Sequence, residues 1–106
     1  MSDLMILCKT DDVKEGAPIS ISPENFPMLA VYEYDGEYFV TDNTCTHSMA
    51  VLTDGYQDDA EIECPFHGGA FSIKTGEATA APCVLPINTY QVTLVNGNIC
   101  IPAVSG

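Results

Sequence analysis

Two short segments of the chain each combine one cysteine with one histidine. The first reads Cys-Thr-His at residues 45–47, and the second, after 16 intervening residues, reads Cys-Pro-Phe-His at residues 64–67. Together they contain both histidines of the sequence. Thiolates and neutral imidazoles are ligands for iron and for zinc, so two of each can complete the shell of a four-ligand centre. We therefore predict a metal site with the ligands Cys45, His47, Cys64 and His67.

The arrangement of these ligands bears on which metal they bind. Zinc modules usually begin with two closely spaced cysteines, whereas here each segment supplies one sulfur and one nitrogen. Mixed pairs suit a site divided between two metals. With Gly68 directly after the second histidine, the pattern resembles the signature of Rieske [2Fe-2S] proteins. The resemblance implies that Cys45 and Cys64 bind one iron and that His47 and His67 bind the other, with inorganic sulfides bridging them.

Residues 54–71 resemble, more narrowly, the soluble Rieske ferredoxins of bacterial aromatic-ring-hydroxylating dioxygenase systems. The resemblance rests on Asp-Gly-Tyr at 54–56, Glu-Ile-Glu-Cys-Pro at 61–65 and His-Gly-Gly-Ala-Phe at 67–71. It implies a one-electron carrier that passes electrons from an NAD(P)H-dependent flavoprotein reductase to a terminal oxygenase in transient complexes. The sequence has no second histidine set for a mononuclear iron and no nucleotide-binding glycine loop. We therefore expect a carrier without a catalytic site of its own.

Two other classes of protein stay open on the sequence. One is a Rieske-like small subunit of another oxidoreductase, such as an assimilatory nitrite reductase, which would co-purify with a sirohaem partner. The other is a structural zinc-binding module that acts in protein interaction. The zinc module predicts a colourless protein with one zinc, whereas the cluster predicts a reddish-brown protein that contains iron and acid-labile sulfide.

Four positions depart from the quinol-oxidising Rieske subunits that the motif also resembles. Ala50 and Phe66 stand where those subunits have two cysteines, so the disulfide between their ligand loops is impossible here. Gly69 replaces a serine and Phe71 replaces a tyrosine, whose hydroxyls would donate hydrogen bonds to cluster sulfurs. Such bonds stabilise the more negative reduced cluster. Their loss predicts a reduction potential toward the bottom of the Rieske range of about −150 to +300 mV.

Length and charge restrict the setting of this site. A chain of 106 residues suits one domain with a modest core. Fifteen Asp and Glu residues against three Lys and Arg residues give a net charge of −12. Nucleic acid and anionic membranes are therefore excluded as partners, because both require basic patches. We expect a monomer that is steered toward basic patches on protein partners.

The sequence also bears on location and on the remaining cysteines. No apolar run reaches transmembrane length, residues 1–10 do not resemble a signal peptide, and without arginine there is no twin-arginine signal. We expect a cytoplasmic protein. Five cysteines are an odd number, and Cys8, Cys83 and Cys100 do not resemble a secreted disulfide framework. We expect these three to be reduced residues of the core or of loops.

Two surface features have alternative interpretations. One is the acidic stretch with Asp58, Asp59, Glu61 and Glu63, which forms either a docking face or an ordinary solvated surface. The other is Ala81-Pro82, which resembles the proline-containing third loop of the family and could also be an ordinary turn.

Short apolar runs separated by turn residues predict β-structure almost throughout. The expected strands are Met5–Cys8, Ile19–Ile21, Met28–Tyr34, Tyr38–Thr41, Glu61–Cys64, Ala70–Ile73, Tyr90–Val95 and Ile99–Ile101. Asp35-Gly36 and Asn96-Gly97 predict two tight hairpins. We expect one all-β domain over residues 1–106, a small antiparallel sandwich or barrel. The Rieske resemblance implies a base of residues 1–42 and 87–106 and a cluster-binding insertion of about residues 43–86.

Overall fold

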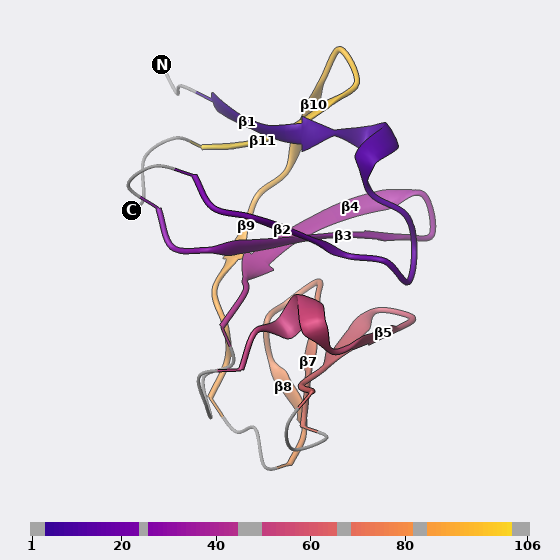
Figure 1. Ribbon diagram of the computed structural model, residues 1–106, viewed down its shortest axis with the longest axis vertical. Coiled ribbons are helices and arrows are strands. Elements are labelled where there is room, and N and C mark those ends of the chain that lie inside the picture. Colours follow the sequence, from indigo (N-terminus) through magenta and orange to yellow (C-terminus); the bar gives the residue numbers. More distant parts are fainter. Residues whose placement is uncertain (1–3, 24–25, 45–49, 66–68, 82–84, 103–106) are drawn as a thin grey trace.

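The structure of the protein is a computed structural model that describes residues 4–23, 26–44, 50–65, 69–81 and 85–102 (Figure 1). Within these ranges the chain forms eleven β-strands and two 3-10 helices of three residues each. The strands are β1 (Leu4–Lys9), β2 (Ile19–Ile21), β3 (Leu29–Tyr34), β4 (Glu37–Asp42), β5 (Tyr56–Asp58), β6 (Glu61–Glu63), β7 (Ala70–Ser72), β8 (Ala78–Ala80), β9 (Thr89–Tyr90), β10 (Thr93–Val95) and β11 (Asn98–Pro102). The helices are η1 (Thr10–Asp12) and η2 (Leu52–Asp54).

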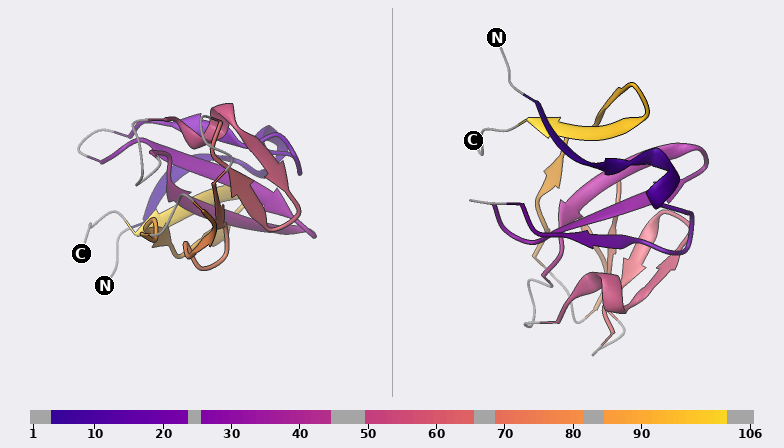
Figure 2. Two further views of the ribbon diagram at one scale, coloured as in Figure 1. Left: turned by 90° about the horizontal axis from the view of Figure 1, so that it is seen from below. Right: turned by 45° about the horizontal axis from the view of Figure 1, so that its top comes forward.

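The strands form three antiparallel sheets with the orders β1-β11-β10, β2-β3-β4-β9 and β5-β6-β7-β8. The first two sheets, which we call the base, contain β1–β4, which lie within Leu4–Asp42, and β9–β11, which lie within Thr89–Pro102. The third sheet uses Tyr56–Ala80 alone. Figure 1 shows the three sheets one below another, and Figure 2 shows the same order from a second direction. The predicted all-β, antiparallel class is confirmed, and the division into a base and an insertion as separate units stays a prediction.

Both predicted hairpins are present. Asp35 and Gly36 have φ angles of 55° and 79°, and they join β3 to β4 with Tyr34 opposite Glu37. Asn96 and Gly97 have φ angles of 51° and 80° and join β10 to β11. Positive φ at both central residues is what a two-residue hairpin requires, and Asp, Asn and Gly adopt it at little cost.

The predicted single strand over Tyr90–Val95 is wrong. The structure has two strands there, because β9 pairs with β4 in one sheet and β10 pairs with β11 in another. Residues 91–92 carry the chain between the two sheets of the base. The sequence prediction also missed β5 and β8, since Tyr56–Asp58 is polar and Ala78–Ala80 is rich in alanine, which is depleted in strands.

The core has two parts that meet at β3. Leu29 and Val31 face the base core, which comprises Val13, Leu29, Val31, Val40, Ile99 and Ile101. Ala30 and Tyr32 face what we call the loop-side core, which comprises Ala30, Tyr32, Ala50, Leu52, Ile62, Cys64, Phe71, Ile73 and Ile87. All four of these β3 residues are 0% exposed. A continuous apolar run is expected for a strand that is covered on both faces. Strand β3 therefore joins the base to the β5–β8 sheet.

Candidate metal-cluster site

The β5–β8 sheet ends in one row of paired residues, Tyr56, Glu63, Ala70 and Ala80. Because neighbouring strands are antiparallel, the chain enters or leaves all four strands at this same end, which we call the loop end. Just beyond the row, the Cys64 backbone N–H donates to the Gly69 carbonyl oxygen at 2.6 Å. The second ligand segment, residues 64–67, therefore begins at the loop end. Ala81 follows β8 at the same end, so the proposed third loop starts there as well.

The described residues on either side of the first ligand segment, residues 45–47, are paired with each other and lie near the start of the second segment. Thr44 and Val51 form an isolated antiparallel bridge across residues 45–50. Gly55, which directly precedes β5, packs closely against β6. A Cβ atom at Gly55 would lie 1.9 Å from the Glu63 carbonyl oxygen and 3.1 Å from the Pro65 ring. The chain that returns from the first segment is therefore held against the start of the second.

Cys64 is the one predicted ligand that the structure describes. It directly follows β6, its side chain is 1% exposed in the loop-side core, and its sulfur is in no disulfide. Cys45, His47 and His67 lie outside the described residues, as does Phe66. Among the described residues alone, no group of three or more His, Cys, Asp or Glu could hold a metal ion. The four-ligand set therefore stays a prediction.

The described surroundings of Cys64 fit a metal-bound thiolate. Ala50 is 2% exposed, and Leu52, Ile62 and Phe71 are 0% exposed in the same core cluster. Of the four positions compared above with the quinol-oxidising subunits, the structure describes three, and they present a methyl at Ala50, no side chain at Gly69 and a phenyl ring at Phe71. None of these three residues has a side chain that can donate a hydrogen bond to sulfur. The described residues around Cys64 therefore fit a cluster that is shielded from water.

The remaining cysteines lie elsewhere or outside the described residues. Cys8 is on β1 and Cys100 is on β11, and both sulfurs are free, as expected. Burial, followed by the negative charge of Asp12, raises the pKa of Cys8 to about 11. A protonated thiol is a poor metal ligand, so Cys8 is unsuited to that role. Cys83 lies outside the described residues.

The acidic stretch lies on the β5–β6 hairpin. Asp58, Asp59, Glu61 and Glu63 are all exposed, and the Thr79 hydroxyl donates to Glu61 Oε1 at 3.2 Å. The Asp59 carboxylate is the largest cause of a raised pKa at Tyr34. A negative potential therefore extends from this hairpin to the neighbouring base. The docking role of these carboxylates stays a prediction.

Two exposed apolar side chains, one of them at the loop end, were missed by the sequence prediction. Tyr56 in the terminal row is 70% exposed, and Leu85, which follows the third loop, is 62% exposed. The signal at Tyr56 was its place in the resembling Asp-Gly-Tyr segment, which we interpreted as a turn. Nothing in the local sequence distinguishes Leu85 from a buried leucine.

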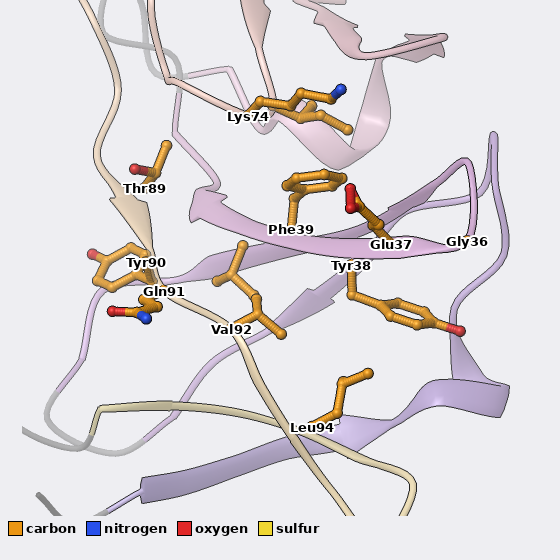
Figure 3. A pocket seen from close by; sticks show the side chains of 12 residues that line it. Gly36, Glu37, Tyr38, Phe39, Lys74, Thr89, Tyr90, Gln91, Val92 and Leu94 are labelled. Atoms are coloured by element: carbon orange, nitrogen blue, oxygen red, sulfur yellow. The ribbon is translucent and has the colours of Figure 1, made fainter.

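A pocket of about 500 Å³ lies at the opposite end of the β5–β8 sheet (Figure 3). Its lining includes Tyr38 and Phe39 from β4, Lys74 from the turn after β7, Val92 from the segment that leads to β10, and Leu94 from β10. The Lys74 ammonium lies over the Phe39 ring at 6.0 Å from its centroid. Since residues 73–74 follow β7 at the end away from Ala70, this pocket is separate from the loop end.

Comparisons with known proteins agree with this geometry. Residues 3–91 match the family model of the Rieske [2Fe-2S] domain. The chain is 42% identical over 102 residues to the "p-cumate 2,3-dioxygenase system, ferredoxin component" of Pseudomonas putida, which covers 95% of this chain and 86% of that protein.

Two solved structures have the same fold. The structure of "Sphingomonas yanoikuyae B1 ferredoxin" aligns with a TM-score of 0.93 at 56% identity, over 94% of this chain and 98% of that chain. A chain in the "Complex of reduced oxygenase and oxidized ferredoxin in carbazole 1,9a-dioxygenase" aligns with a TM-score of 0.88 at 33% identity, over 93% of this chain and 92% of that chain.

Proposed function

Because this chain belongs to the Rieske [2Fe-2S] domain family, we propose that it carries single electrons from an NAD(P)H-dependent flavoprotein reductase to a terminal aromatic-ring dioxygenase. The observation that carries the proposal is its match, over 95% of its length, to a protein named as the ferredoxin component of a dioxygenase system. Relatives of this kind are components that serve an oxygenase, so the chain is a carrier and the catalysis belongs to its partner. The same match favours this function over a zinc module or a nitrite reductase subunit.

The cofactor of the family is a [2Fe-2S] cluster, which supplies the ability to accept and release one electron. We propose that Cys45, His47, Cys64 and His67 hold it. Cys64 contributes a buried sulfur at the base of the second segment. Ala50 and Phe71 are buried in the same loop-side core as Cys64, and this core shields the sulfur from water.

We propose a reduction potential near the lower end of the Rieske range of about −150 to +300 mV. Gly69 and Phe71 support this proposal, because neither has the side-chain hydroxyl that would donate a hydrogen bond to a cluster sulfur and raise the potential. A spectroscopic redox titration of the purified protein measures the midpoint. A midpoint well above zero would contradict the proposal.

The partners dock, in this proposal, at the loop end. Exposed Tyr56 supplies apolar contact there, and the net charge of −12 steers the carrier toward basic surfaces. Electron-transfer encounters are small, with less than about 1,200 Å² buried, so a few apolar contacts and acidic steering suffice. A transient encounter of this kind suits a monomer. The rate of reduction by the flavoprotein should fall as ionic strength rises, and a rate independent of salt would exclude steering.

We also propose a cytoplasmic location, where NAD(P)H is available to the reductase. Among the described residues there is no helix with the length and apolar character needed to cross a membrane. The proposed base and insertion follow the sheets, because the β5–β8 sheet uses residues from within 43–86 and the base sheets use residues outside it.

Chemical analysis and a coupled assay test the function. The purified protein should contain iron and acid-labile sulfide in equal amounts and should give a paramagnetic signal after reduction with dithionite. With NADH and a flavoprotein ferredoxin reductase present, the rate of cytochrome c reduction should rise with the concentration of this protein. A colourless protein that contains zinc, or cytochrome c reduction at the same rate without the chain, would refute the carrier function.

A further inference from the structure

Asn43 is a fully buried polar residue with an unusually complete set of partners. Its side chain is 0% exposed. Its Nδ2 donates to Ser20 Oγ at 3.1 Å and to Thr53 Oγ1 at 3.0 Å, and its Oδ1 accepts from the Thr53 backbone N–H at 2.9 Å. Its backbone N–H donates to the Met28 carbonyl oxygen, and its carbonyl oxygen accepts from the Leu52 N–H at 2.7 Å. Every hydrogen-bonding atom of this residue is therefore used.

These partners come from three separate parts of the chain. Ser20 is on β2 and Met28 directly precedes β3, so both belong to the base. Leu52 and Thr53 are in η2, on the return side of the first ligand segment. Asn43 itself directly follows β4, on the outgoing side. One side chain therefore ties both sides of the segment at residues 45–50 to each other and to the base sheet.

We call Asn43 with its hydrogen-bond partners the Asn43 node. The bridge between Thr44 and Val51 lies one residue closer to the first ligand segment than the bond between Asn43 and Leu52. It is the last pairing described before the first ligand segment begins. An isolated bridge is a weak constraint, because it lacks the neighbouring pairs of a ladder. The amide of Asn43 supplies the missing constraint, since Leu52 and Thr53 are held by the backbone and the side chain of the same residue.

Removing this amide would take hydrogen bonds from both of its side-chain partners. The half-buried Thr53 would lose bonds at its N–H and its hydroxyl, whereas the exposed Ser20 hydroxyl can bond to water. A group that is shielded from water and left without a partner costs more than an intact bond contributes. Thr41 offers a contrast. It is the other buried polar side chain among the described residues, and it bonds to the Tyr32 hydroxyl at 2.9 Å within the base sheet.

We infer that Asn43 is a positioning residue that holds the base of the first ligand segment, and with it Cys45 and His47, in register with Cys64. The inference rests on the proposed function, because the roles of Cys45 and His47 are part of that proposal. It predicts that Asn43 controls how firmly the cluster is retained, beyond any effect on the stability of the fold. Residues that orient metal ligands commonly change metal affinity by about 10-fold to 100-fold when they are removed.

The test compares Asn43→Ala and Thr53→Val with the control Thr41→Val. Cluster loss is followed by visible absorbance in the presence of an iron chelator, below the thermal midpoint of every variant. We expect Asn43→Ala to lose its cluster about tenfold faster than the unmodified protein and to shift the g-values of the reduced protein. Thr53→Val removes one hydroxyl partner and should have a smaller effect in the same direction. Thr41→Val should lose its cluster at the rate of the unmodified protein, even if its thermal midpoint falls as far as that of Asn43→Ala.

A second measurement does not depend on iron. Amide hydrogen exchange on the protein as isolated should be faster at Leu52 and Thr53 in Asn43→Ala and unchanged there in Thr41→Val. Unchanged exchange at both amides would overturn the inference, and so would equal cluster loss in Asn43→Ala and Thr41→Val. If Asn43→Ala does not fold, Thr53→Val decides by the same two measurements. An unmodified protein without iron would instead refute the proposed function, and the exchange data would still test Asn43.

Discussion

The base and the loop end of this protein are built from different kinds of contact. Strands β1, β3 and β4 of the base have six residues each, whereas all four strands of the β5–β8 sheet have three. At the loop end the described chain is held by the Thr44–Val51 bridge, the Cys64–Gly69 hydrogen bond, the close approach at Gly55 and the hydrogen bonds of Asn43. The base therefore differs from the loop end in the length of its strand pairing, although buried apolar residues lie on both faces of β3.

Substitution of two buried cysteines, one in each region, tests this difference most directly. Cys64 at the loop end and Cys100 in the base are each 1% exposed. We expect Cys64→Ser to abolish the visible absorbance and all electron transfer, because it removes a soft sulfur ligand. Cys100→Ser should keep the cluster and lose about 1–3 kcal/mol of unfolding free energy, the cost of burying a poorly partnered hydroxyl. Iron analysis and urea denaturation measure both effects, and a full iron content in Cys64→Ser would remove Cys64 from the ligand set.

Two glycines extend the comparison to the backbone. A Cβ at Gly55 would lie 1.9 Å from the Glu63 carbonyl oxygen, so Gly55→Ala must separate the chain after η2 from β6. We expect it to cost about 3 kcal/mol of unfolding free energy and to accelerate cluster loss. Gly97 in the β10–β11 hairpin has open space around it and a φ of +80°, so Gly97→Ala should cost about 1 kcal/mol from backbone strain alone. A normal rate of cluster loss in Gly55→Ala would show that this close approach does not hold the ligand segments.

Two exposed side chains separate docking from folding. Tyr56 at the loop end is 70% exposed and Leu94 on β10 is 54% exposed. Tyr56→Ala should raise the KM of the terminal oxygenase for the carrier several-fold, because apolar contact at the docking surface is lost. Leu94→Ala should leave that KM unchanged, and neither change should alter the thermal midpoint appreciably. Steady-state turnover at varied carrier concentration measures this, and an equal response of the two variants would place the docking surface elsewhere.

The smallest expected effect is a pH dependence that arises in the base. The pKa of Cys8 is raised from 9.0 to about 11, mainly by burial, so the folded state holds this proton more tightly than the unfolded state. Its stabilising contribution is complete below pH 9 and is lost as the pH rises to about 11. Urea denaturation at pH 8 and pH 11 measures the unfolding free energy, which should decrease less between these pH values in Cys8→Ala than in the unmodified protein. Burial and Asp42 also raise the pKa of Tyr90, so part of the decrease should persist. Identical decreases would exclude Cys8 as a cause.

Local sequence signals predicted the base well. The apolar run at Met28–Tyr34 indicated a strand, and Asp35-Gly36 and Asn96-Gly97 indicated the turns, because each depends on the preferences of adjacent residues. The same signals failed at Tyr90–Val95. That run has the pattern of one strand, and its division between two sheets depends on partners in β4 and β11 that lie far away in the sequence.

The sequence by itself determined the chemistry of this protein: its two cysteine and histidine pairs, its acidic charge and its all-β class, which follow from residue types and short spacings. Only the tertiary structure decided that the flanks of residues 45–49 and 64–69 meet at one end of a small sheet, with Cys64 buried and Asn43 holding the first of them. The reason is physical. Residue types set which atoms can bind a metal, but strand register and packing between distant segments set where those atoms are held.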